Sequence, residues 1–198
     1  MWGNYNEAWV AYHGGMATPR SVPVDRATLV AVAADLADRE GWHTMTLSDV
    51  AKAVGRHPSS MYAHVESLDD LRHEIALLSM SELADKVWRA VLGKVGADAL
   101  LAIAETYRDF ARDFPGRTAS VSWVREDDPE FAVVASRLHE PVHVTFRSFG
   151  LSDEQTAVAH RVFGATIDGF VRTVPNEDIH QAVGVFLAAM ETGLWPAH

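Results

Sequence analysis

Side chains that could do chemistry gather in residues 46–65, whose sequence is T-L-S-D-V-A-K-A-V-G-R-H-P-S-S-M-Y-A-H-V. The stretch carries hydroxyls, imidazoles and one guanidinium. Such groups donate hydrogen bonds to phosphate oxygens and to the edges of nucleic-acid bases. The side chains that we expect to face outward from its second half are those of His57, Ser59, Ser60, Ala63 and His64. The stretch is therefore a candidate for contacting nucleic acid.

Two short helices joined by a turn would position these side chains. Thr46 and Asp49 form a T-x-x-D capping box that opens the first helix, and Gly55 ends it because glycine tolerates a positive φ. Pro58 fits the first turn of the second helix, where its missing N–H is not needed. Apolar residues at helical spacing predict one buried face on each helix: Leu47, Val50, Ala51 and Val54 on the first, and Met61, Tyr62 and Val65 on the second. Two helices of about two turns with such a turn form a helix-turn-helix unit, whose second helix enters the DNA major groove.

The residues in and around this unit resemble the N-terminal domain of the TetR family of transcriptional regulators. The resemblance rests on Gly41, Thr46-Leu47-x-Asp49-Val50-Ala51, Gly55 and Met61-Tyr62-x-His64-Val65-x-x-x-Asp69-x-Leu71. It implies that Tyr62 and His64 touch DNA phosphates, while residues earlier in the second helix reach base edges. The DNA-binding residues that it indicates are Thr46, Ser48, Arg56, His57, Ser59, Ser60, Tyr62 and His64. Arg56 stands where the family usually has an apolar residue, and Ser48 where it often has a basic one; a helix-turn-helix that serves only packing is the alternative.

The overall charge argues against nucleic acid. The chain of 198 residues has a formal net charge of −10, and residues 20–75 contain six bases against nine acids. Phosphate neutralisation by Lys and Arg supplies much of the affinity for DNA. Placement can offset this deficit, because six basic residues are expected near the DNA-facing side: Arg20, Arg26, Lys52, Arg56, His57 and His64. We therefore expect moderate, salt-sensitive affinity, and the alternative is a regulator-like helical protein whose DNA binding is weak or lost.

Composition also limits the cellular setting. The hydrophobic content of 48% is ample for a buried core, and no apolar run approaches the roughly 20 residues that cross a bilayer. The first residues, M-W-G-N-Y-N-E, lack the basic region and apolar stretch of a secretion signal. Without cysteine, the chain has no disulfide framework and no thiolate metal site. We expect a cytoplasmic protein with no membrane partner.

Helical periodicity continues through the rest of the chain, and no segment alternates like a strand. The sequence therefore predicts an all-α fold of about nine helices. Outside the helix-turn-helix, the predicted helices cover residues 25–40, 67–92, 97–114, 128–149, 152–172 and 176–191, and Pro141 is expected to kink the fourth of them. We divide the chain into an N-terminal extension (residues 1–22), a three-helix helix-turn-helix DNA-binding domain (23–66) and a ligand-binding and dimerisation bundle (67–198). The extension is expected to be loosely ordered; an arm that reaches DNA or the partner subunit is the alternative.

The second half of the chain resembles the WHG-type C-terminal domain of one class of the same family. The matching residues are Tyr107-x-x-Phe110-Ala111-x-x-x-Pro115-Gly116-Arg117, Asp128-Pro129-Glu130, Gly150-Leu151-Ser152 and Gly169-Phe170, with Asp168 where a His is usual. Aromatic residues here supply surface for an apolar pocket, although each one alone could simply fill the core. The candidate ligand-binding residues are Tyr107, Phe110, Trp123, Phe163 and Asp168.

The charged residues of this half narrow the kind of effector. Most arginines after Lys94 fall between apolar positions and are expected to face water. A buried anionic group needs a basic partner. We therefore predict an aromatic or lipophilic effector without a negative charge. Asp168 could pair with a ligand amine, or it could cap a backbone turn beside Gly169.

Metal and catalytic sites find little support. His139 and His143 are four residues apart, the spacing at which two imidazoles on one helix could share a metal, but Pro141 lies between them and His160 is remote in sequence. The chain has no G-x-S-x-G, glycine-rich phosphate loop or H-E-x-x-H. We predict no metal, no cofactor and no enzyme, and a helical enzyme that uses the histidines is the less favoured alternative.

The last two predicted helices carry more apolar surface than a monomer needs. Gly164, Ala165 and Gly169 would let a partner helix approach closely, so we predict an isologous homodimer through a four-helix bundle. A symmetric dimer presents two reading helices to successive major grooves, which calls for a near-palindromic operator. The sequence thus predicts a ligand-responsive transcriptional regulator, most simply a repressor, that a small-molecule effector releases from double-stranded operator DNA.

Overall fold

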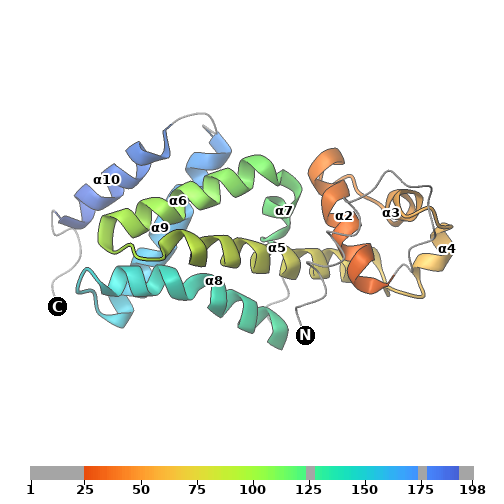
Figure 1. Ribbon diagram of the computed structural model, residues 1–198, viewed down its shortest axis with the longest axis horizontal. Helices are drawn as coiled ribbons and strands as arrows, with labels where there is room; N and C mark the ends of the chain where they lie inside the picture. Colours follow the sequence, from red (N-terminus) through yellow and green to blue (C-terminus); the bar gives the residue numbers. More distant parts are fainter. Residues whose placement is uncertain (1–24, 124–127, 174–177, 192–198) are drawn as a thin grey trace. The chain divides into compact units, whose positions relative to one another are not determined.

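The computed structural model describes residues 25–123, 128–173 and 178–191, which form nine α-helices and no strand (Figure 1). The predicted all-α fold is confirmed. In these three ranges no helix is both long and apolar enough to cross a membrane. The predictions made for residues 1–22 lie outside the described residues.

The helices are α2 (Arg26–Glu40), α3 (Leu47–Ala53), α4 (Pro58–Met61), α5 (Leu68–Val91), α6 (Gly96–Asp113), α7 (Pro115–Ser120), α8 (Pro129–Arg147), α9 (Asp153–Thr173) and α10 (Ile179–Glu191). The chain divides into two compact units. Unit 1 comprises Met1–Ser79 and Phe114–Glu126, and unit 2 comprises Met80–Asp113 and Asp127–His198. Helix α5 therefore contributes residues to both units. The functional division at residues 66 and 67 stays a prediction.

Side-chain caps fix where several helices begin. The Thr46 hydroxyl accepts from the backbone N–H of Asp49 at 3.3 Å, and the Asp49 carboxylate accepts from the backbone N–H of Thr46 at 3.0 Å. Ser152 and Gln155 exchange the same two bonds at 2.9 and 3.2 Å before α9. The Asp128 side chain caps α8 through an N–H in its first turn. These caps satisfy backbone donors that a helix cannot pair internally, and the predicted Thr46–Asp49 capping box is confirmed.

The break predicted at Pro115–Gly116 is the start of a short helix. Pro115 is the first residue of α7, a position that needs no backbone N–H. Gly116 lies so close to α2 that a Cβ atom there would be 2.2 Å from the carbonyl carbon of Ala37. Pro115 and Gly116 therefore turn the chain and also allow α7 to pack against α2. The sequence did not reveal α7.

Arg117 of α7 also binds to α2. Its guanidinium donates from Nη2 to Asp35 Oδ1 at 2.6 Å and from Nη1 to Asp38 Oδ2, and its backbone N–H donates to Asp38 Oδ1 at 2.8 Å. The side chain is only 3% exposed. This arginine is an exception to the expectation that most arginines of this half face water, and two carboxylates of α2 compensate its buried charge.

Each unit has its own apolar core. In unit 1, α2, α3, α4 and the first part of α5 enclose a cluster that includes Leu29, Val50, Met61, Val65, Leu71 and Ile75. In unit 2, α6, α8, α9 and α10 pack on one another in a helical bundle (Figure 1). Helix α8 runs without interruption through Pro141. Its buried residues include Val142 and Phe146.

Candidate functional site

An exposed polar row runs along α3, the turn and α4 in unit 1. Most of the side chains that the sequence assigned to DNA contact are exposed; Ser60 and His64 are partly buried. Tyr62 is 64% exposed, whereas Met61 and Val65 are fully buried or nearly so. The prediction that Tyr62 helps to form the buried face was therefore wrong. Its ring is available to an outside partner, as the family resemblance implies.

Helix α4 is shorter than predicted, with one turn instead of two. His57 caps it: the imidazole Nδ1 accepts from the backbone N–H of Ser59 at 3.4 Å and lies 2.9 Å from the Ser59 hydroxyl. An Nδ1 that accepts leaves the proton on Nε2. The Ser60 hydroxyl donates to the His57 carbonyl at 2.7 Å. The helix start thus offers an imidazole N–H donor and hydroxyl oxygens that can still accept.

The start of α3 is less open to an outside partner. The Thr46 hydroxyl donates to Asp49 Oδ2 at 2.6 Å while accepting from the Asp49 backbone. These hydrogen bonds from Thr46 hold the pKa of the Asp49 carboxyl below its usual value. Thr46 therefore serves the helix cap first. Ser48 and Arg56 are exposed on the same surface.

A second polar group lies in unit 2, between α6 and α9. The Tyr107 hydroxyl donates to Asp168 Oδ1 at 3.0 Å, and Arg172 Nε donates to both Asp168 oxygens at 2.8 and 2.9 Å. Burial, reinforced by the Asp168 charge, raises the pKa of Tyr107. Asp168 lies within α9, which continues to Thr173, so it does not cap a turn beside Gly169.

The predicted ligand-binding aromatics fall into different surroundings. Phe163 of α9 packs against Phe146 and Phe186, with ring centroids 5.7 and 5.2 Å apart, so one aromatic cluster joins α8, α9 and α10. Phe110 is 2% exposed in α6. Trp123 belongs to unit 1, where it meets Trp42 edge-on at 6.3 Å and lies 5.2 Å from the Arg72 guanidinium carbon. The structure therefore joins Tyr107 with Asp168 but gives Trp123 partners of its own.

Three histidines meet in unit 2. His143 Nε2 lies 3.0 Å from His160 Nδ1, and the His139 and His160 ring centroids are 4.5 Å apart. Dismissing His160 as remote in sequence was therefore wrong: α8 and α9 bring it onto the other two imidazoles. Burial, with smaller effects of His139, His143 and Arg161, lowers the pKa of His160 to about 4. Burial also lowers the pKa of His139. Among the described residues no group of three such side chains has the geometry to hold a metal ion.

No family model matches the chain. The chain is 32% identical over 154 residues to the uncharacterized HTH-type transcriptional regulator Rv0681 of Mycobacterium tuberculosis, covering 77% of this chain and 71% of that protein. Its fold is similar to that of the TetR family transcriptional regulator PfmR from Thermus thermophilus, with a TM-score of 0.61 and 20% identity over 89% of this chain and 100% of that one. It is also similar to AibR, solved in complex with isovaleryl coenzyme A and operator DNA, with a TM-score of 0.60 and 14% identity over 83% of this chain and 96% of AibR.

Proposed function

The chain belongs to the TetR family of transcriptional regulators, and from this premise we propose that it is a repressor that binds a near-palindromic operator as a homodimer. A small-molecule effector bound in unit 2 releases it from DNA. The observation that carries the proposal is the exposed polar row on α3 and α4, which unit 1 presents on a fully formed helix-turn-helix. The protein is a transcriptional regulator and not an enzyme, and binding chromosomal DNA would place it in the cytoplasm.

The polar row has groups for both kinds of DNA contact. The Nε2–H of His57 would donate to guanine N7 or O6, and the Ser59 oxygen would accept from an exocyclic amine. Tyr62 and His64 would bind phosphates, as the family resemblance implies, and so fix the protein on the duplex without reading its sequence. Ser48 and Arg56 are exposed and would add to the DNA-contacting surface.

Selection of bound duplexes from a random-sequence library tests the DNA-binding proposal directly. Tyr62→Phe and His64→Ala should weaken binding to the selected duplex and to other duplexes by similar factors. Ser59→Ala should change the preference at one base position, while Ser122→Ala, an exposed serine elsewhere in unit 1, should change nothing. If the wild-type protein selects no duplex and shows no mobility shift at low or high salt, it is a regulator-like protein without DNA binding.

A face of α9 and α10 supports the homodimer. Val162 is 48% exposed and Val185 is 73% exposed. A Cβ atom added at Gly164, Gly169 or Gly184 would meet nothing within 4 Å among the described residues. Packing within the chain therefore does not call for glycine at these places, whereas a close partner helix would. Val183 of α10 is buried, so substitution there would unfold the bundle as readily as split a dimer.

Light scattering at micromolar concentration gives the oligomeric state. We expect a dimer for the wild type and a monomer for Val185→Glu combined with Ala165→Glu. Val133→Glu is the matched control, because Val133 is 66% exposed on α8; this variant should stay dimeric. A dimer that survives the double substitution would place the interface elsewhere.

For the effector, we propose an aromatic or lipophilic compound that packs against the bundle side chains and uses the Tyr107–Asp168 pair as its polar anchor. Asp168 already has a basic partner in Arg172, so a ligand amine is not required to neutralise it. AibR was solved with isovaleryl coenzyme A, whose acyl end is apolar but whose coenzyme A part carries anionic phosphates, so it supports only the apolar part of this proposal. Thermal-shift screening against matched neutral, cationic and anionic aromatics tests the proposal, and release of the selected duplex is its functional readout. Stabilisation by anions alone would show that the chemistry of the bundle has been misjudged.

A further inference from the structure

Arg26, in the first turn of α2, contacts two other parts of unit 1. Its Nη1 donates to the backbone carbonyl of His64 at 2.8 Å. Its Nη2 donates to Asp70 Oδ1 at 3.1 Å and to Glu74 Oε1 at 3.0 Å. One guanidinium therefore joins the start of α2, the segment after α4 and the start of α5.

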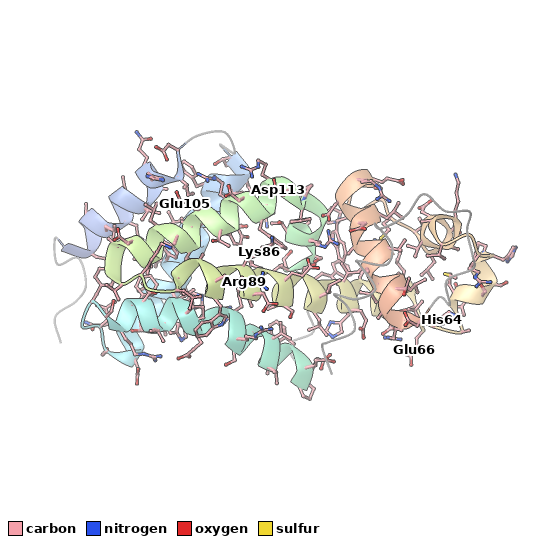
Figure 2. The ribbon with its side chains drawn as sticks, in the orientation of Figure 1. His64, Glu66, Lys86, Arg89, Glu105 and Asp113 are labelled. Atoms are coloured by element: carbon pink, nitrogen blue, oxygen red, sulfur yellow. The ribbon has the colours of Figure 1, made fainter. Side chains whose placement is uncertain are left out.

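The segment after α4 depends on such outside support. Helix α4 ends at Met61, so Tyr62 and His64 stand beyond it in a turn, closed by bonds from the N–H groups of His64 and Val65 to the Met61 carbonyl at 2.8 and 3.0 Å. Asp70 accepts from the backbone N–H of Glu66 at 3.0 Å as well as from Arg26. Figure 2 labels His64 in this turn and Glu66 just after it. The Asp70 carboxylate thus holds the backbone N–H of Glu66, and the Arg26 guanidinium holds the backbone carbonyl of His64.

These contacts also change the role in DNA binding that we expect of Arg26. The sequence grouped this arginine with the bases near the DNA-facing side. In the structure two carboxylates flank one guanidinium, so the three side chains together carry a net negative charge, which repels phosphate. The Asp70 and Glu74 side chains are 15% and 22% exposed, against 43% for Arg26. Such pairs interact more strongly than fully exposed ones, because less water screens them.

We propose that Arg26 is a positioning residue for DNA recognition: it fixes the Tyr62–His64 segment through the His64 carbonyl and Asp70, and it does not bind a phosphate. This inference rests on the proposed DNA-binding function. A one-turn helix has too few internal hydrogen bonds to define the place of the residues that follow it. The phosphate contacts of the Tyr62–His64 segment would therefore depend on a side chain nearly 40 positions earlier in the chain.

Asp70→Asn distinguishes the two possible roles of Arg26, because they predict changes of opposite sign in the affinity for DNA. If Arg26 bound phosphate, loss of the Asp70 charge would free the guanidinium and tighten binding. If Arg26 and Asp70 hold the turn, the variant should weaken binding to the selected duplex, on the order of tenfold, as should Arg26→Gln. Asp69→Asn removes the same charge from the adjacent position, where the side chain is 75% exposed; it should leave binding unchanged or slightly tighter. Arg39→Gln, at the exposed end of α2, is the matched control for Arg26→Gln.

Two further readouts distinguish positioning from a general loss of stability. Removal of a phosphate-binding arginine reduces the slope of log affinity against log salt by about 1, so Arg26→Gln should leave that slope unchanged. Tyr62→Phe should cost less affinity in the Arg26→Gln background than in the wild type, because both changes disrupt the same contacts. Circular dichroism and thermal melting confirm that each variant is folded.

The outcomes are distinct. Weaker binding by Asp70→Asn, with an unchanged salt slope for Arg26→Gln and non-additivity with Tyr62→Phe, supports the inference. Tighter binding by Asp70→Asn, or a lower salt slope for Arg26→Gln, overturns the inference alone. Absence of any binding by the wild-type protein overturns both the inference and the proposed function.

Discussion

Arg117 in unit 1 and His160 in unit 2 are basic side chains, the first buried and the second partly buried. The two units accommodate them differently. Arg117 keeps its charge and lies against Asp35 and Asp38. Burial raises the pKa of Asp38, and this effect outweighs the opposing hydrogen bonds and charge of Arg117. His160 lies against two other imidazoles, and burial lowers its pKa to about 4, so it is neutral near pH 7.

The difference follows from the chemistry of the two groups. A guanidinium cannot lose its proton in a protein, so burying it requires carboxylates in a fixed arrangement. An imidazole can enter the interior neutral and needs only hydrogen-bond and ring contacts. We infer that the contact between α7 and α2 is held in one arrangement by charge, while the contact between α8 and α9 can adjust. A bundle that accepts an effector needs the second kind of contact.

The largest expected effect comes from breaking the charged contact. Arg117→Met leaves Asp35 and Asp38 without their buried guanidinium, which should lower the free energy of unfolding by about 3–5 kcal/mol. Arg112→Met removes an arginine whose side chain is 62% exposed beside Asp109 and Asp113; it should leave the free energy of unfolding nearly unchanged, because water screens exposed ion pairs. Urea denaturation followed by tryptophan fluorescence measures both. Equal stability of the two variants would show that charge does not hold α7 against α2.

Gly116→Ala tests the same contact through shape instead of charge. The new methyl group would lie 2.2 Å from the backbone of Ala37, so α7 must move off α2. Overpacking of this kind should cost about 1–3 kcal/mol. Thr118→Ala, which removes a methyl group and a hydroxyl that donates to the Phe114 carbonyl just before α7, should cost less, about 1 kcal/mol. The same urea titration compares them, and an unaffected Gly116→Ala would mean that α7 is loosely seated.

The smallest expected effect is a pH dependence from the neutral contact. An imidazole in the unfolded chain has a pKa of about 6.5, whereas that of His160 is about 4 in the folded protein. Between these values the unfolded chain binds a proton that the folded chain does not, so the unfolding free energy falls as the pH is lowered from about 6.5 to 4.

Between these pH values the unfolding free energy of His160→Gln should depend less steeply on pH than that of the wild type. The difference in slope should correspond to less than about one bound proton, since His160 is only partly buried. Carboxylates titrate in the same range in both proteins, so the informative quantity is the difference between wild type and variant. A difference that stays constant from pH 7 to pH 4 would show that folding does not lower the pKa of His160.

Sequence reasoning succeeded where the cause is local. Thr46 with Asp49 and Ser152 with Gln155 are three residues apart, so spacing alone predicts their caps. It failed where the partner is distant: Arg117 lies 79 positions from Asp38, and His143 lies 17 positions from His160. Apolar periodicity shows that a helix has a buried side but not which helix covers it. The residues proposed to contact DNA belong to one continuous stretch, so sequence reasoning could group them, whereas it could not find the partners of Asp168 and Trp123.

Placement of α7 in unit 1 bears on how such regulators can be recombined. Unit 1 is not a continuous gene segment, because Phe114–Glu126 belong to it together with the first 79 residues. An exchange of reading heads between two regulators, with one crossover in α5, would set the α2 of one parent against the α7 of the other. The hybrid would then need a small residue opposite its Ala37 and a cation opposite its two aspartates. A chimera designer should therefore transplant two segments, and recombination during evolution would meet the same requirement.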